Sequence, residues 1–362
     1  MKKLISVLLV IAMMSCMLVG CSSTDNEDTG TAKPDIDDNG LKVHDIVSGP
    51  INPLTGETID EENAAVRPYC VMINNHANAR PCKGLSNASI VYEALVEGCI
   101  TRMMAVFYDI NDVTVGAIRS SRPYYISLVQ AYDAIYVHAG GSDQAYSDMK
   151  TYDIDHMDFC YGHAPSAFYR DQDRLNSGLS MEHTLFARGS KLVEYANSKN
   201  MPAEHDSSFD TTYGLTFSPE AATQCDNDSA AFTVYYYGSK GASNTSTTLK
   251  YDSSKGAYNA FISGKEYTDG NDTSIDFTNV IILNVPTKTV DNYGHQAMEL
   301  TGSGTGYFCC GGKYVAINWE RDGRNDNFHY TLTDGTPLAL GIGKTFISIA
   351  PLDSTGGVDW AA

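Results

Sequence analysis

Short apolar runs separated by polar turns fill the region that follows the first 66 residues. The runs at 67–75, 89–97 and 100–108 are rich in Val, Ile, Met and Tyr, which is typical of β-strands. Gly98 and Cys99 form the corner between the second and third runs, so these two strands are expected to make a hairpin. The same pattern predicts two further strands, at 113–118 and 133–139.

Apolar residues at helical spacing predict three helices in the same region, at 122–131, 143–151 and 182–200. Pro123 suits a first helical turn, where its missing N–H is not needed, and Ser142 can cap the second helix. The mixture of strands and helices places residues 46–215 in an α/β (or α+β) domain with a mixed sheet.

After about residue 216 the pattern changes to short alternating strands and turns with almost no helix. The pairs Asp322–Gly323 and Asp334–Gly335 are typical turn sequences between such strands. We therefore expect a β-rich domain at 216–362. Its apolar runs lie at 232–237, 248–251, 257–262, 279–285, 297–301, 306–310, 314–319, 328–332 and 345–350.

The first 21 residues have a different character. Lys2 and Lys3 precede an apolar run at 4–19, and Leu18-Val19-Gly20-Cys21 resembles the lipobox of bacterial lipoprotein signal peptides, in which the cysteine is acylated. The alternative is an uncleaved membrane anchor, but the run is shorter than the roughly 20 residues that span a bilayer. We therefore expect an extracytoplasmic protein anchored to the cell membrane by lipidated Cys21. Residues 22–45 are polar and acidic and predict a flexible tether.

The net charge of the chain limits the classes of partner that it is expected to bind. The chain has 25 basic and 44 acidic side chains and a net charge of −19; without Lys2 and Lys3, 23 basic against 44 acidic side chains give −21. Nucleic-acid phosphates would be repelled, so no nucleic-acid partner is expected. An anionic ligand of the cell wall would need a local basic cluster, and solubility alone also accounts for the acidity.

Seven cysteines remain after the signal segment and Cys21, and none of them forms a CxxC motif. An odd number without metal-ligand spacing predicts neither a metal site nor a complete disulfide framework. Cys309 and Cys310 are adjacent in an alternating run, so their side chains should face opposite sides of a sheet.

Polar residues gather at the predicted strand ends of the first domain. In open α/β sheets ligands bind beyond such ends, so one cleft could collect these side chains. Arg119 and Arg122 are the best candidates for an anion clamp, because guanidinium groups hold carboxylates or phosphates with two parallel hydrogen bonds. Gly140 and Gly141 precede a predicted helix and could let backbone amides approach an anion. The candidate ligand-binding residues are Asn75, Arg80, Glu93, Glu97, Arg102, Arg119, Arg122, His138, Ser142 and His183.

Two other interpretations of this set stay open. Glu93 and Glu97 could pair with Arg102 and Arg119 in a buried ion-pair network of purely structural value. Ser120, Ser121 or Ser142 could act as a nucleophile with His138 or His183 as the base, but no GxSxG motif is present and no catalytic residue can be assigned. Whether the chain is an enzyme is therefore undecided from its residues.

Dense motifs along the chain resemble the YerB-like lipoprotein family. They include Val71-Met72-Ile73-Asn74-Asn75, Ile90-Val91-Tyr92-Glu93, Ile118-Arg119-Ser120-Ser121-Arg122-Pro123 and Asp133 to Ser142, with Gly304-Thr305-Gly306 and Gly343-Lys344-Thr345 near the end. The resemblance implies two successive domains of unknown function and no established reaction. Cys99 departs from a Gly-Gly corner, and Met181-Glu182-His183-Thr184 departs from the usual Pro-His-Asn. An Arg and a His typical of the family are missing near Tyr258-Asn259 and Tyr267-Thr268-Asp269, which puts a role of that second-domain site in doubt.

A fainter likeness in layout is to the LytR-CpsA-Psr phosphotransferases, which attach anionic polymers to peptidoglycan. It would imply that Arg80, Arg102, Arg119 and Arg122 hold pyrophosphate, and that Glu93 or Asp109 binds Mg²⁺; otherwise no cofactor is expected. Fold-level analogy is weak evidence for function. The leading hypothesis is a lipoprotein that binds a cell-envelope ligand or partner in the polar cleft, and a third alternative is a structural partner of another membrane protein with an exposed apolar patch.

Overall fold

The computed structural model describes residues 50–60, 65–238, 245–270, 272–352 and 356–360. The predicted signal segment, its Cys21 and the predicted tether at 22–45 lie outside the described residues. Within the described ranges, no helix is long and apolar enough to cross a membrane.

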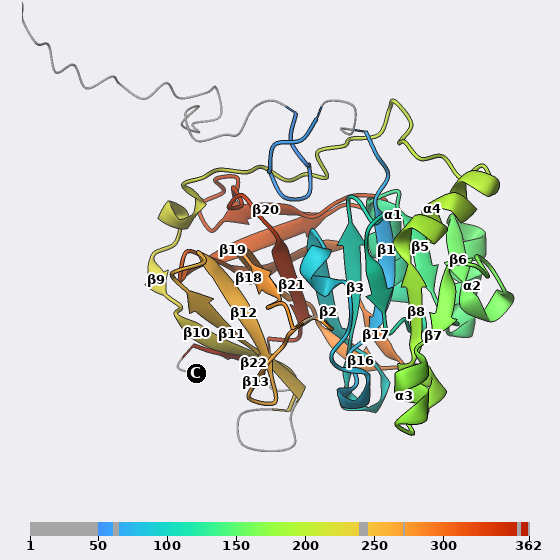
Figure 1. The fold of residues 1–362 in the computed structure, drawn as a ribbon. Coiled ribbons are helices and arrows are strands. Elements are labelled where there is room, and N and C mark those ends of the chain that lie inside the picture. The colour runs from blue at the N-terminus through green and yellow to red at the C-terminus, as the bar shows by residue number, and fades with distance from the viewer. Residues whose placement is uncertain (1–49, 61–64, 239–244, 271, 353–355, 361–362) are drawn as a thin grey trace, which may run out of the picture. The chain divides into compact units, whose positions relative to one another are not determined.

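Eleven strands of the described chain form one mixed sheet (Figure 1). Its order is β20-β19-β18-β15-β21-β2-β3-β1-β5-β6, with β9 attached to β19. The strands are β1 (Tyr69–Asn74), β2 (Ile90–Leu95), β3 (Thr101–Phe107), β5 (Ile135–His138), β6 (His156–Asp158), β9 (Asn227–Asp228), β15 (Asn279–Asn284), β18 (Gly302–Cys310), β19 (Lys313–Arg321), β20 (His329–Leu332) and β21 (Thr345–Ala350).

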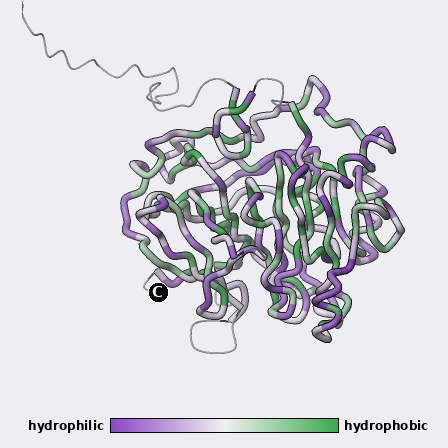
Figure 2. The backbone as a smooth tube through the Cα atoms, viewed as in Figure 1, coloured by the Kyte–Doolittle hydropathy of each residue, from purple (hydrophilic) through white to green (hydrophobic). Residues whose placement is uncertain are grey.

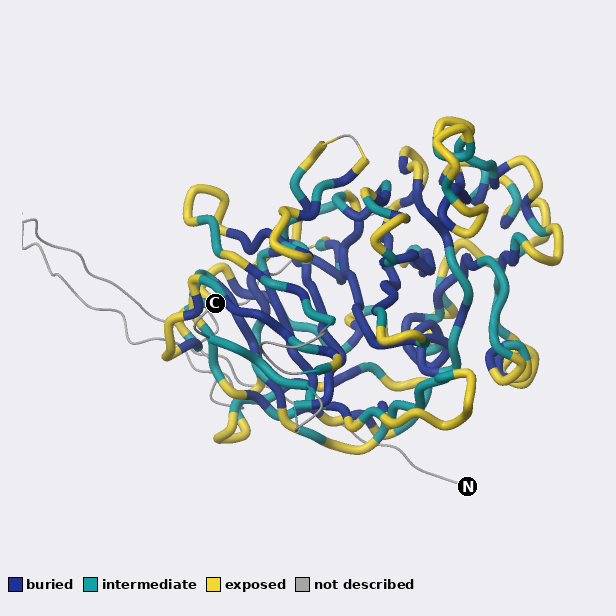
Figure 3. The backbone as a smooth tube through the Cα atoms, turned by 90° about the horizontal axis from the view of Figure 1, so that it is seen from below, coloured by how far each residue is buried: buried dark blue, intermediate teal, exposed yellow. Residues whose placement is uncertain are grey.

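The central strands are apolar on both faces, which is why they are buried on both sides. In β1, Val71 and Ile73 belong to one hydrophobic cluster, whereas Cys70 and Met72 belong to another on the opposite face. Figure 2 shows hydrophobic stretches along the strands and hydrophilic ones at the connections, and Figure 3 shows the same strands buried and the connections exposed.

Helices α1 (Pro123–Ala131) and α2 (Asp143–Thr151) cover one face of the sheet. Pro123 begins α1, and the Ser142 hydroxyl caps α2 by accepting the N–H of Ala145 at 3.3 Å, as the sequence predicts. The other two helices are α3 (Gln172–Asn176) and α4 (Gly189–Ser198).

Three smaller sheets complete the described structure. The largest runs β13-β12-β11-β10-β22 with β14 beside β12, and its β10 packs against β2 and β21 of the central sheet. Its strands are β10 (Ala231–Tyr237), β11 (Thr245–Asp252), β12 (Ala257–Ile262), β13 (Lys265–Glu266), β14 (Asp276–Phe277) and β22 (Gly357–Asp359). The others are β4 (Thr114–Gly116) with β8 (Leu185–Arg188) and β7 (Phe168–Arg170), and the hairpin of β16 (Thr287–Thr289) and β17 (Gln296–Met298).

The predicted fold class is confirmed: a mixed α/β region precedes a strand-rich region. The predicted helix at 182–200 is wrong in its first part, where Leu185 and Ala187 alternate into the core and β8 pairs with β4 and β7. The region 152–180, for which the sequence gives no pattern, contains β6, β7 and α3.

The sheet continues across the expected boundary near residue 216. Strand β21 pairs in parallel with β2 through Thr345↔Ile90 to Ile349↔Ala94, so strands from both expected domains meet at the centre of the sheet. All the described residues accordingly belong to one compact unit. The seven described cysteines are all free thiols, and Cys309 and Cys310 enter opposite hydrophobic clusters as their alternation predicts.

Candidate functional site

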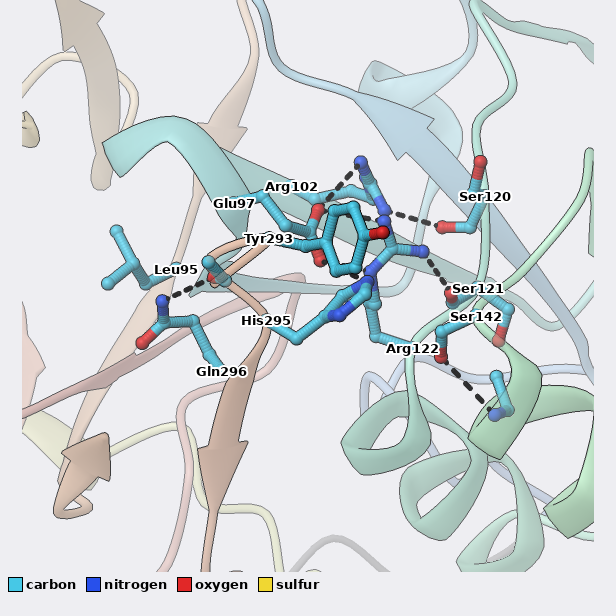
Figure 4. A network of polar contacts seen from close by, with 12 residues as sticks. Leu95, Glu97, Arg102, Ser120, Ser121, Arg122, Ser142, Tyr293, His295 and Gln296 are labelled. Carbon is cyan, nitrogen blue, oxygen red and sulfur yellow. Dashed lines mark hydrogen bonds and ion pairs between the residues drawn. The ribbon is translucent and has the colours of Figure 1, made fainter. Parts of the chain in front are cut away.

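The turn between β2 and β3 carries an ion-pair network built on Glu97 (Figure 4). Both oxygens of Glu97 accept hydrogen bonds from Arg122, with 2.7 Å between Arg122 Nη2 and Glu97 Oε2. Arg102 lies behind this pair, with its Nη2 at 3.9 Å from the same oxygen and its Nη1 donating to the Ser120 carbonyl at 2.8 Å. Arg122 Nη1 also donates to the Ser121 carbonyl at 2.6 Å.

Burial and the neighbouring charges have opposite effects on the pKa of Glu97 in this network. Burial opposes ionisation of Glu97, but the hydrogen bonds and charge of Arg122, together with Arg102, outweigh it and lower the Glu97 pKa. Burial, followed by repulsion from Arg122, lowers the pKa of Arg102 to about 10. Glu97 and Arg102 are therefore charged at neutral pH, and both guanidinium groups already contact protein partners.

The tip of the β16–β17 hairpin covers this network. His295 Nε2 lies 3.7 Å from Glu97 Oε1, and His295 Nδ1 contacts Asp291 Oδ2 at 2.6 Å. Tyr293, at the tip, leaves 84% of its surface exposed and is the most exposed of the large hydrophobic side chains in the described ranges. Gln296 holds the tip together by donating to the Gly294 carbonyl at 2.7 Å.

A cavity of about 580 Å³ lies between the hairpin and the N-terminal ends of α1 and α2. Its acidic and basic side chains are those of Arg122, Asp143, Asp291, His295, Glu299 and Arg324, and its apolar groups come mainly from the hairpin. The lining residues are Arg122–Tyr124, Ser127, Ser142–Gln144, Val290, Asp291, Tyr293, His295–Thr301 and Arg324. This volume suits a small organic ligand or a short segment of chain.

A second group of predicted residues is sealed inside the protein. Glu93 is 1% exposed, and its carboxylate accepts hydrogen bonds from Asn75 Nδ2, Thr101, Tyr236 and Thr247 at 2.5–2.9 Å. Burial raises the Glu93 pKa although these donors and the nearby Arg80 favour the charged form. Arg80 is partly buried, and its Nε has no hydrogen-bond partner among the described residues.

Arg119 and His183 form a third group on the other side of β1. Arg119 Nη2 lies 2.5 Å from Glu182 Oε2, and Asn74 Nδ2 donates to His183 Nδ1 at 3.1 Å. The His183 ring stacks on His76 with ring centroids 4.8 Å apart. Burial is the main cause of the lowered pKa of His183.

His138 belongs to a fourth group, at the ends of β5 and β6. Its Nδ1 donates to the Gly140 carbonyl at 2.9 Å, so its Nε2 accepts from His156 Nδ1 at 3.0 Å. Burial lowers the His138 pKa to about 4 despite the nearby Asp158, so the ring is neutral at physiological pH.

The ten predicted residues therefore divide among four places rather than one cleft. Arg122 and Ser142 line the cavity, with Glu97 and Arg102 directly behind Arg122. The hairpin residues that complete the cavity are absent from the prediction, because nothing in their spacing links them to the strand ends of the first domain. A local signal was present: Asp291, Tyr293, Gly294 and His295 combine turn residues with groups that bind ligands.

The phosphotransferase likeness implies that either Glu93 or Asp109 binds Mg²⁺, and the two carboxylates lie in different surroundings. Glu93 is enclosed by its four donors, and Asp109 lies beyond the opposite end of β3 from Arg102. Across the described ranges, no group of three or more His, Cys, Asp or Glu side chains is arranged to hold a metal ion.

Two family profiles match the chain. Residues 54–202 match the N-terminal domain, and residues 234–347 the C-terminal domain, of the family described as protein of unknown function (DUF3048). The chain belongs to this family. It is 30% identical over 306 residues to the putative lipoprotein YerB of Bacillus subtilis (strain 168), covering 83% of this chain and 86% of the relative.

The fold agrees with the crystal structure of the YerB protein from Bacillus subtilis. The TM-score is 0.72 at 27% identity, and the match covers 85% of this chain and 99% of the other. The resemblance to the YerB-like family is thereby confirmed. In terms of the two DUF3048 domains, the cavity belongs to both, since Arg122 and Ser142 come from the N-terminal one and the hairpin from the C-terminal one.

Proposed function

We propose that this chain is an extracytoplasmic lipoprotein, anchored through Cys21, that binds a polar organic ligand of the cell envelope in the cavity beside the β16–β17 hairpin. The relative's name, putative lipoprotein, supports the anchored location. The N-terminal signal pattern supports it independently, because a lysine pair, a short apolar run and a lipobox-like sequence together direct lipid attachment.

The cavity of about 580 Å³ is the observation that carries the binding proposal. Two cations of its polar wall are held by ion pairs, Arg122 with Glu97 and Arg324 Nη2 with Asp148 at 3.2 Å. Preorganised polar groups lose little conformational entropy on binding, so they favour affinity and orientation. Tyr293 adds an exposed aromatic ring that can stack on a ligand.

The paired charges argue for a ligand with both donors and acceptors rather than a simple anion. A free anion would have to compete with Glu97 for Arg122 and with Asp148 for Arg324. Fragments of peptidoglycan, which combine hydroxyl, amide, carboxylate and amine groups, fit this requirement and would be within reach of a membrane-anchored protein.

Calorimetric titration with soluble peptidoglycan fragments tests the proposal. Wild-type protein should bind saturably, and Tyr293→Ala should weaken binding about tenfold, since loss of an aromatic anchor costs on the order of 1–2 kcal/mol. Tyr161→Ala is the matched control, because Tyr161 is 67% exposed but does not line the cavity. No saturable binding, or equal losses in both variants, would contradict binding at this cavity.

A further inference from the structure

The inner strand of the hairpin has one unpaired edge. Among the described strands, β17 pairs only with β16, through Thr287↔Met298, Lys288↔Ala297 and Thr289↔Gln296. The Val290 N–H donates to the His295 carbonyl at 2.8 Å, which makes that pair a hydrogen-bonded one. Because hydrogen-bonded and non-hydrogen-bonded pairs alternate, the peptide groups of Gln296 and Met298 point away from β16.

This edge borders the cavity. Gln296, Ala297 and Met298 all line it, and β17 also lies close to α1. The cavity therefore lies beside two N–H and two C=O groups, those of Gln296 and Met298, that β16 leaves unpaired. An extended peptide placed there would add a third strand and satisfy all four groups.

The charges around the cavity favour a cation. Arg122 and Arg324 are paired with Glu97 and Asp148. In contrast, Asp143 and Glu299 line the cavity, are exposed, and form no ion pair with a described residue. The exported chain also carries a net charge of −21, the difference between 23 basic and 44 acidic side chains once Lys2 and Lys3 are excluded. A bound cation would thus meet two uncompensated carboxylates in an acidic field.

We propose that the ligand is an extended peptide with an amine-bearing side chain, bound by strand addition to β17 with its amine near Asp143 and Glu299. This inference rests on the proposed function and adds the ligand class. Main-chain hydrogen bonds to Gln296 and Met298 supply affinity that is largely independent of sequence, while the amine supplies preference.

Three synthetic peptides test the two parts of this proposal with full-length exported protein. The first is N-acetyl-Ala-Ala-Lys-Ala-Ala amide, the second has norleucine for Lys, and the third has ester bonds in place of the amides on either side of the Lys. Titration should show at least fivefold weaker binding for the second and third peptides. Hydrogen exchange should slow at the amides of Gln296 and Met298 when the first peptide is bound.

Protein variants separate site charge from overall charge. Asp143→Asn and Glu299→Gln should each weaken the Lys peptide about threefold at low salt, with a smaller effect at high salt. Asp112→Asn removes one exposed carboxylate elsewhere and should leave affinity unchanged. Equal weakening by Asp112→Asn would mean diffuse attraction and overturn the amine site.

The outcomes also distinguish this inference from the proposed function. Strand addition is wrong if the ester peptide binds as tightly as the first peptide and hydrogen exchange does not slow at the amides of Gln296 and Met298. Failure of the Lys peptide to bind at millimolar concentration would overturn the peptide class altogether. If peptidoglycan fragments still bound and depended on Tyr293, the proposed function would stand while this inference failed.

Discussion

Glu93 is a carboxyl group that the fold buries without an ion pair to any described residue. Its Oε1 accepts from the Asn75 amide and Thr101, whereas its Oε2 meets only the hydroxyls of Tyr236 and Thr247. Hydroxyl groups can rotate to accept a proton, so a protonated Glu93 would carry its hydrogen on Oε2. Burial raises the pKa of Glu93, so folding favours the neutral form more than the unfolded chain does.

Replacing Glu93 with Gln should therefore leave the fold intact and change its response to pH. A carboxyl whose pKa is raised by folding stabilises the protein fully below its ordinary value of 4.5 and loses that contribution as pH rises through the folded value. Relative to Glu93→Gln, the wild-type free energy of unfolding should thus fall as the pH is raised above 4.5, by at most about 1.4 kcal/mol per pH unit.

Urea denaturation across that pH range measures the difference. Glu93→Ala serves as the control for hydrogen bonding, because it leaves all four donors without their acceptor. It should lower the free energy of unfolding by about 2–4 kcal/mol at every pH. A wild-type curve parallel to that of Glu93→Gln would mean that Glu93 is ionised in the folded protein throughout.

The residue types of this interior could be inferred from the sequence, but their pairing could not. The alternative of a structural ion-pair network named Arg102 and Arg119 as the partners of Glu93 and Glu97. Arg102 does lie 3.9 Å from Glu97, but the hydrogen-bonded partner of Glu97 is Arg122. Arg119 pairs with Glu182 instead, and Glu93 pairs with neutral donors. Tyr236 and Thr247 lie 143 and 154 residues after Glu93 in the chain. Only the tertiary packing of β10 and β11 against β2 brings them together.

At the scale of helices and strands, tertiary packing can override the secondary structure that a local sequence prefers. The sequence predicts α1, α2 and most strands, because their apolar spacing matches their burial. It fails at 182–188, where helix-forming residues enter β8 through contacts with β4 and β7. Helix α4 then begins at Gly189, whose N–H donates to the Val113 carbonyl at 2.8 Å.

Gly189→Ala should destabilise the protein although Ala is the better helix former. A Cβ at this position would lie 1.6 Å from the Ile110 carbonyl oxygen, so the start of α4 would have to move away from the turn after β3. We expect a loss of about 2–4 kcal/mol in free energy of unfolding, against the roughly 1 kcal/mol that propensity alone would add.

Gly178→Ala is the matched control for this prediction. Gly178 has a φ of +82°, but a methyl group added there would meet no atom of the described residues within 4 Å, so only backbone strain of about 1 kcal/mol is expected. Denaturant titration of both variants should rank Gly189→Ala clearly below Gly178→Ala. The reverse order would show that α4 can shift freely at its first turn.

At the scale of the whole molecule, the two DUF3048 segments share one sheet and one pair of cores. Val234 and Leu249 of the C-terminal segment join the same hydrophobic cluster as Val71 and Ala105 of the N-terminal segment. On the other face, Arg321 donates to the Ser127 carbonyl of α1 at 2.6 Å while fully buried. The cavity itself needs both segments, since the helices supply one wall and the hairpin the other.

The two segments should consequently unfold together. A chain of residues 46–215 made alone would expose the β2 edge that β21 covers and the apolar face that β10 covers, so it should be aggregation-prone or lack fixed packing.

Full-length exported protein should show one calorimetric transition whose van't Hoff and calorimetric enthalpies agree. Adding residues 216–362 as a separate chain should restore a dispersed amide spectrum to the first fragment. This prediction is wrong if the intact protein shows two resolved transitions, or if the isolated fragment is well folded. Each segment would then have its own hydrophobic core, and the cavity would lie at the interface between two independently folding domains.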